Sequence, residues 1–103
     1  MDKGRWHGLT LPQQMGNIGS EIARARHWEG QGDAERRNAA IERALELIDL
    51  TLSDVRRRAG LREIARLREV VCAWYCGSDA YDVPPAALQE YCTSFVLLSA
   101  GRA

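Results

Sequence analysis

The stretch from Asp33 to Leu52 constrains the fold of this chain more than any other part of the sequence. Its apolar residues fall along one stripe of a helix, at Ile41, Ala44, Leu45, Ile48 and Leu52. Asp33 follows a glycine and suits the N-cap, because its side chain can accept hydrogen bonds from the first free backbone N–H groups. Any fold must cover this stripe, so the remaining segments are candidates to pack against it.

Three further amphipathic segments can supply that cover. Thr10 to Gln13 forms a capping box with Pro12 in the first turn, which predicts a helix that runs to about Glu29. Gly30 to Gly32 then forms a short turn, so this helix and the one from Asp33 make a hairpin. Gly16 and Gly19 weaken the first helix intrinsically, and we expect another backbone to approach it closely there.

The second half of the chain predicts two more helices. One covers Leu61 to Tyr75, and the other begins after Asp82, with two prolines in its first turn. No segment alternates between apolar and polar residues as a half-buried strand does. We therefore expect an all-α protein, an antiparallel four-helix bundle that forms one domain over residues 10–100, preceded by a flexible N-terminal arm over residues 1–9.

Composition argues against several classes of partner, although a local charged patch remains open. The 103 residues include 14 basic and 14 acidic side chains, so no global charge attracts nucleic acid or an anionic membrane. No apolar run approaches the roughly 18 residues of a membrane span, and MDKGRWHGL lacks the apolar core of a signal peptide. We expect a cytoplasmic protein without membrane contact, in which the three cysteines are reduced thiols.

Two charged residues interrupt apolar stripes. Glu21 lies within the apolar face of the first helix, and Arg68 lies within that of the third. Both could reach water at the edge of the bundle. The sharper hypothesis is a partly buried ion pair between Glu21 and Arg68, for which Asp49 and Glu46 are competing partners of the arginine.

A group of arginines crowds the loop before the third helix and the helix itself. A phosphate group is a candidate ligand for Arg56, Arg57, Arg58, Arg62 and Arg66. However, Glu63 and Glu69 lie three residues either side of Arg66, which is the spacing of ordinary ion pairs on a solvated helix face. No aromatic residue is interleaved to stack on bases, so nucleic-acid binding is not favoured.

The thiols offer a metal site as a further alternative. Cys72 and Cys76 are four residues apart and share a helix face, and Cys92 and His7 could complete a zinc tetrahedron. The spacing is not that of a zinc knuckle, and cysteine is a common buried residue. We therefore expect no cofactor and treat the thiols as core or boundary groups.

Two stretches resemble known helical families. GQGDAERRNAAIERALEL, from Gly30 to Leu47, resembles one helical hairpin of tetratricopeptide repeats, which implies a peptide-binding array only where neighbouring copies exist. With the preceding SEIARARHW it also resembles the first half of HEPN domains, four-helix bundles of toxin–antitoxin and defence systems. Members active on RNA carry an arginine four to six residues before a histidine, and neither His7 nor His27 has one. That resemblance therefore implies the bundle, and a dimer, without the nuclease.

The whole chain, with QQMGNIGSEIARA and LREIARLREVVC, resembles small prokaryotic helical proteins, which implies no activity. We expect a non-enzymatic protein-interaction module that forms a homodimer. Surplus apolar residues predict the interface: Leu50, Val70, Phe95, Val96, Leu97 and Leu98. The alternatives are a HEPN-like module associated with nucleic acid and a metal-binding bundle that uses Cys72 and Cys76.

Overall fold

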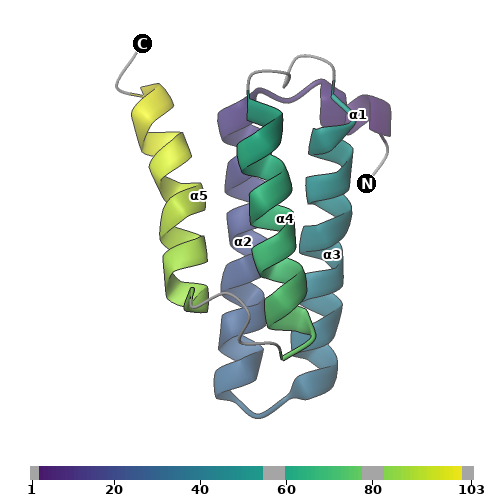
Figure 1. Cartoon of the computed structure of the whole chain (residues 1–103), viewed down its shortest axis with the longest axis vertical. Helices are drawn as coiled ribbons and strands as arrows, with labels where there is room; N and C mark the ends of the chain where they lie inside the picture. Colours follow the sequence, from purple (N-terminus) through teal and green to yellow (C-terminus); the bar gives the residue numbers. More distant parts are fainter. Residues whose placement is uncertain (1–2, 55–59, 78–82, 101–103) are drawn as a thin grey trace.

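A hairpin of two long helices forms the centre of the protein. The computed structural model describes residues 3–54, 60–77 and 83–100, with side chains up to Thr93. In it, α2 (Leu11–Gly30) and α3 (Ala34–Leu52) pack side by side along their length. Figure 1 shows them joined by the short turn at the lower end of the molecule.

Local signals define the ends of this hairpin as predicted. The Thr10 N–H donates to Gln13 Oε1 at 2.8 Å, and the Gln13 N–H donates to Thr10 Oγ1 at 3.3 Å, which confirms the capping box. Asp33 Oδ1 accepts from the Arg36 N–H at 3.0 Å. Gly32 adopts a φ of 72°, which glycine reaches without steric cost, so the chain can reverse there.

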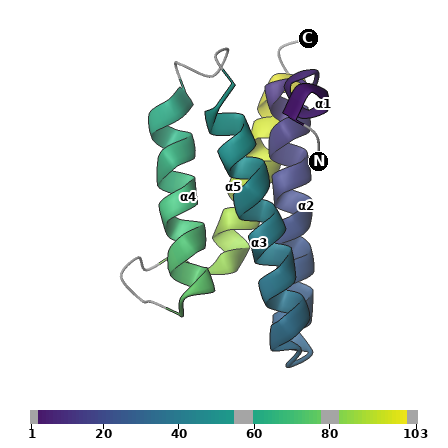
Figure 2. The same ribbon diagram turned by 90° about the vertical axis from the view of Figure 1, so that its right-hand side faces the viewer.

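The other two long helices pack on different members of the hairpin. Helix α4 (Leu61–Tyr75) contacts α3, and α5 (Pro85–Ala100) contacts α2. Figure 2 shows α3 between α4 and α2, and it shows α5 diverging from α4 toward the C-terminal end of α5. The described residues contain helices and no strand, which confirms the all-α class.

A fifth helix corrects the prediction for the N-terminus. Lys3–His7 forms α1, and Trp6 within it is completely buried against α3. We expected residues 1–9 to be a flexible arm because they show no hydrophobic period. A helix of this length needs no period, since one indole supplies most of the apolar surface that it buries.

The core lies where α2, α3 and α4 meet. On these three helices it is built from β-branched and small side chains of the predicted stripes, namely Ile18, Ile22, Ala25, Ile41, Ala44, Ile48, Ile64 and Val71. Helix α5 adds Leu88 and Cys92. Leu45 and Leu52, which were predicted to face inward, are only half-buried. These lie at the margins of the helix contacts, where a stripe wider than the contact area leaves side chains partly in water.

Candidate functional site

A groove with a largely apolar lining lies between α4 and α5. Its volume is about 380 Å³. Its lining is dominated by apolar side chains: Leu67, Val70, Val83, Ala87, Leu88 and Tyr91. The groove exists because α4 packs on α3 while α5 packs on α2, so the two helices stand side by side without closing on each other.

Val83 marks the open side of this groove. It is 39% exposed and is the one large hydrophobic residue that is exposed among the described side chains. Leu67 and Leu88 form the floor and are almost fully buried, so the groove joins the core below. A continuous apolar surface of this kind is costly to leave in water and is typical of a contact site.

Tyr91 closes one end of the groove. Its hydroxyl donates a hydrogen bond to Glu63 Oε2 at 3.3 Å. Burial, and then the Glu63 carboxylate, raise the pKa of Tyr91 to about 12. The phenol is therefore neutral at physiological pH and serves as a hydrogen-bond donor rather than a base.

Glu63 and Arg66 form the polar rim on α4, and both are exposed. The spacing of Arg66 from Glu63 and Glu69 predicted ordinary ion pairs along the helix. This prediction is wrong, because Arg66 makes neither an ion pair nor a hydrogen bond within the described part of the chain. An unpaired cation thus stands at the edge of the apolar groove.

The predicted interface residues divide between three places. Val70 lines the groove, but it is only 7% exposed and belongs to the core, so it is not the surplus apolar residue that we expected. Leu50 is half-buried on α3 beside α1, and its carbonyl oxygen lies 3.1 Å from His7 Nε2. The side chains of Phe95, Val96, Leu97 and Leu98 lie outside those that the structure describes.

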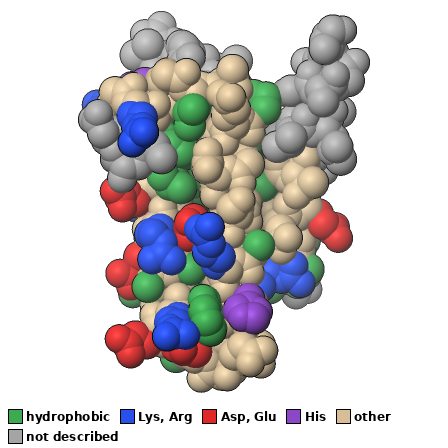
Figure 3. Space-filling model, turned by 180° about the vertical axis from the view of Figure 1, so that it is seen from behind, with side chains coloured by type: hydrophobic (Ala, Val, Ile, Leu, Met, Phe, Trp, Pro, Cys, Tyr) green, Lys and Arg blue, Asp and Glu red, His purple; other side chains and the backbone are tan. Residues whose placement is uncertain are grey.

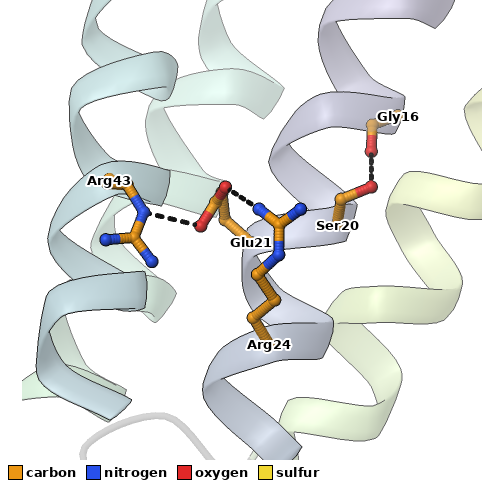
Figure 4. A network of polar contacts seen from close by, with 5 residues as sticks. All are labelled: Gly16, Ser20, Glu21, Arg24 and Arg43. Carbon is orange, nitrogen blue, oxygen red and sulfur yellow. Dashed lines mark hydrogen bonds and ion pairs between the residues drawn. The ribbon is translucent and has the colours of Figure 1, made fainter. Parts of the chain in front are cut away.

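The predicted pair between Glu21 and Arg68 does not form. Figure 4 shows Glu21 between two arginines, Arg24 one turn along α2 and Arg43 on α3. Arg43 Nε donates to Glu21 Oε2 at 3.0 Å, and the Glu21 side chain is 11% exposed. The pairing failed because the apolar face that holds Glu21 docks on α3, so the nearest cation comes from α3 and not from α4.

Arg68 pairs instead with the competing partner on α3. Its Nε donates to Asp49 Oδ1 at 2.6 Å, and its Nη1 lies 3.6 Å from Cys72 Sγ. The hydrogen bond to Asp49, followed by the charge of that carboxylate, raises the pKa of Arg68. Both groups are about half-exposed, so this is a surface contact between α3 and α4.

The face made by α2 and α3 carries charges of both signs (Figure 3). A polar hollow of about 270 Å³ lies there around Glu21, Arg24 and Arg43. Sequence reasoning missed these two arginines, although the spacing of Glu21 and Arg24 was a readable i,i+3 signal. Because Glu21 and Glu46 line the same hollow, the arginine charges there are matched by carboxylates.

The arginines predicted to bind phosphate are only partly described. Arg56, Arg57 and Arg58 lie outside the described residues. Arg62 and Arg66 are exposed on α4, and of these two only Arg66 lines the groove. The phosphate site therefore stays a prediction.

The four candidate metal ligands do not form a cluster. Cys72 is half-buried, Cys76 is exposed and Cys92 is buried where α5 meets α2. His7 is occupied at the far end of α3, where its Nε2 lies 3.2 Å from Ser53 Oγ. Burial raises the pKa of the Cys92 thiol to about 12, so this group is protonated at neutral pH. Within the described ranges, no three histidine, cysteine or acidic side chains are placed to hold a metal ion.

A buried polar network lies at the junction of α1, α2 and α3, and sequence reasoning missed it. The Trp6 indole N–H donates to Thr51 Oγ1 at 2.9 Å. Gln14 Nε2 donates to the Trp6 carbonyl at 3.0 Å and to Asp54 Oδ2 at 3.3 Å. The buried polar atoms of these side chains have hydrogen-bond partners in the interior. The network therefore holds α1 against α2 and α3 and has a structural role.

Comparison of the chain with protein-family models, with curated proteins and with solved structures finds no match. The resemblances to tetratricopeptide repeats and to HEPN domains therefore stay predictions. Among the described helices, none combines the length and the apolar character that crossing a membrane requires.

Proposed function

We propose that this protein is an interaction module without catalytic activity of its own, and that it forms a homodimer through the groove between α4 and α5. The observation that carries this proposal is the apolar lining of the groove, open to solvent at Val83. Removing such a surface from water contributes about 25 cal/mol for each Å² buried.

The arrangement of the helices supports a partner at this position. Helix α5 contacts α2, and an adjoining side of α5 and the facing side of α4 border the groove. The sequence of α5 continues with Phe95-Val96-Leu97-Leu98, which contains no charge. A helix with apolar residues around much of its circumference favours burial on more than one side. A second copy of the chain would bury this surface on both partners at once.

Light scattering across micromolar concentrations tests the proposal, and we expect the mass of a dimer. Val83→Glu places a charge at the open side of the groove, outside any helix, and should yield a monomer with unchanged helix content. Ala34→Glu is the matched control, since Ala34 is exposed on α3 and does not line the groove. A monomer mass for the unaltered protein at every concentration contradicts the proposal.

A further inference from the structure

The rim of the groove contains a self-complementary pair of charges. Glu63 and Arg66 lie three residues apart on α4, both exposed and both lining the groove. They do not pair with each other, and Arg66 has no partner in the part of the chain that is described. The Glu63 carboxylate receives one hydrogen bond there, from Tyr91, through its Oε2 atom.

Helix geometry determines how a second copy would meet these charges. Three residues of an α-helix span about 4.5 Å along its axis. Two copies can be related by a two-fold axis that is perpendicular to α4 and passes midway between these residues. Their α4 helices then run antiparallel. Glu63 of each copy then lies opposite Arg66 of the other, and each contact occurs twice.

We infer that Arg66 of one copy pairs with Glu63 of the other across a two-fold axis at the α4/α5 groove, and that these two ion pairs select a second copy of this chain as the occupant. The inference rests on the proposed homodimer and adds its register and its partner choice. Charge complementarity argues for a second copy of this chain. When two such rims meet in opposite directions, the acid of each lies opposite the base of the other.

The apolar lining and the charged rim have different roles in this interface. Burial of the exposed Val83 and of the half-buried Ala87 and Tyr91 supplies attraction without direction. Exposed ion pairs add little affinity, but an arrangement that brings like charges together is penalised. The rim therefore decides which helix alignment the apolar contact adopts.

Charge reversal tests the pairing directly, with the dimer dissociation constant measured by light scattering or sedimentation. Arg66→Glu and Glu63→Arg each place like charges opposite one another twice, and each should weaken the dimer about tenfold or more. The double variant Glu63→Arg/Arg66→Glu restores both attractions and should return close to the original affinity. An equimolar mixture of the two single variants should form a heterodimer, because all-acidic and all-basic rims then face each other.

Two controls separate the pairing from other effects. Arg62→Glu makes the same change of charge on α4 at an exposed residue that does not line the groove, and should leave the dissociation constant unchanged. Glu69→Arg makes the same change of charge as Glu63→Arg at an exposed residue of α4 that does not line the groove, and should also leave the dissociation constant unchanged. Circular dichroism of each variant verifies its helix content. If Glu63→Arg fails to fold, the dimer dissociation constants of Arg66→Glu and Arg62→Glu still test the pairing. Equal constants for these two variants overturn it.

The outcomes distinguish the inference from the proposed function. If the protein is a dimer that Val83→Glu dissociates, but Arg66→Glu behaves like Arg62→Glu, the pairing is wrong and the dimer stands. If both single reversals weaken the dimer and the double variant does not recover, the two residues contact other groups and the pairing is also wrong. A monomeric wild-type protein overturns the homodimer, and the pairing with it.

Discussion

Trp6 and Thr51 together attach a helix of only five residues to the rest of the protein. The indole is completely buried, and its single N–H group has Thr51 Oγ1 as its acceptor. Thr51 is itself fully buried, and its hydroxyl donates to the Leu47 carbonyl at 2.9 Å. One hydroxyl group thus accepts from Trp6 and donates to its own helix, so both polar atoms are satisfied in the interior.

Thr51→Val should lower the free energy of unfolding by about 1–3 kcal/mol, because it leaves the buried indole N–H without an acceptor. Valine has nearly the shape of threonine, so a cavity contributes little to this loss. Thr51→Ser is the matched control, since it retains the hydroxyl and should cost less. Urea denaturation at equal protein concentration measures both. Equal stabilities of the valine and serine variants would show that the indole finds another partner.

Among the helices, the contact between α2 and α5 depends on close approach at Gly19. A Cβ atom placed on this glycine would lie 3.0 Å from the Cβ atom of Cys92. Glycine in the middle of a helix costs stability intrinsically, and here the cost is offset by the packing of α5 directly on the α2 backbone. A few residues further along, Arg26 of α2 donates a hydrogen bond to Gln89 of α5.

Gly19→Ala should therefore destabilise the protein by about 1–2 kcal/mol, although alanine favours helix, because the new methyl group pushes Cys92 and α5 outward. Gly30→Ala is the control on the same helix, since nothing lies within 4 Å of the added atom there. That variant should be as stable as the original or slightly more stable. Thermal denaturation of both variants measures the difference. Two equally stable variants would indicate that α5 adjusts to the methyl group without cost.

At the scale of the whole molecule, the open groove follows from how α4 and α5 pack on different helices of the central hairpin. Helix α4 covers α3, α5 covers α2, and their facing sides border the space between them. Helices packed in this way leave apolar side chains along the uncovered seam, where a second molecule can complete the packing.

A dimer makes the stability of the fold depend on concentration, because association stabilises the folded chain by mass action. We expect the thermal midpoint of unfolding to rise when the protein concentration is increased from the dissociation constant to 100 times that value. The rise should correspond to about 2–3 kcal/mol of added stability. For Val83→Glu the midpoint should not change with concentration over the same range. Calorimetry or circular dichroism measures both proteins. A wild-type midpoint that is independent of concentration would argue against association in the folded state.

The sequence by itself determined the four long helices and the ends of the central hairpin. Asp33, Thr10 and Gln13 interact with backbone groups three residues away, so their roles are visible in any short stretch of sequence. The same holds for Leu61 to Tyr75, whose predicted bounds agree with those of α4. The apolar stripes of these helices also predicted most of the core, since the period of an α-helix is the same in every protein.

Only the tertiary structure decided which groups meet. A helical wheel shows the side of a helix on which Glu21 lies, but the cation opposite depends on which helix docks there, and here it was Arg43 of α3. The same reason explains Trp6, whose acceptor lies 45 residues away in the sequence, and Val70, which became core because α5 stands beside α4. Local interactions depend on spacing along the chain, whereas these contacts depend on how the helices pack, and no spacing encodes that packing.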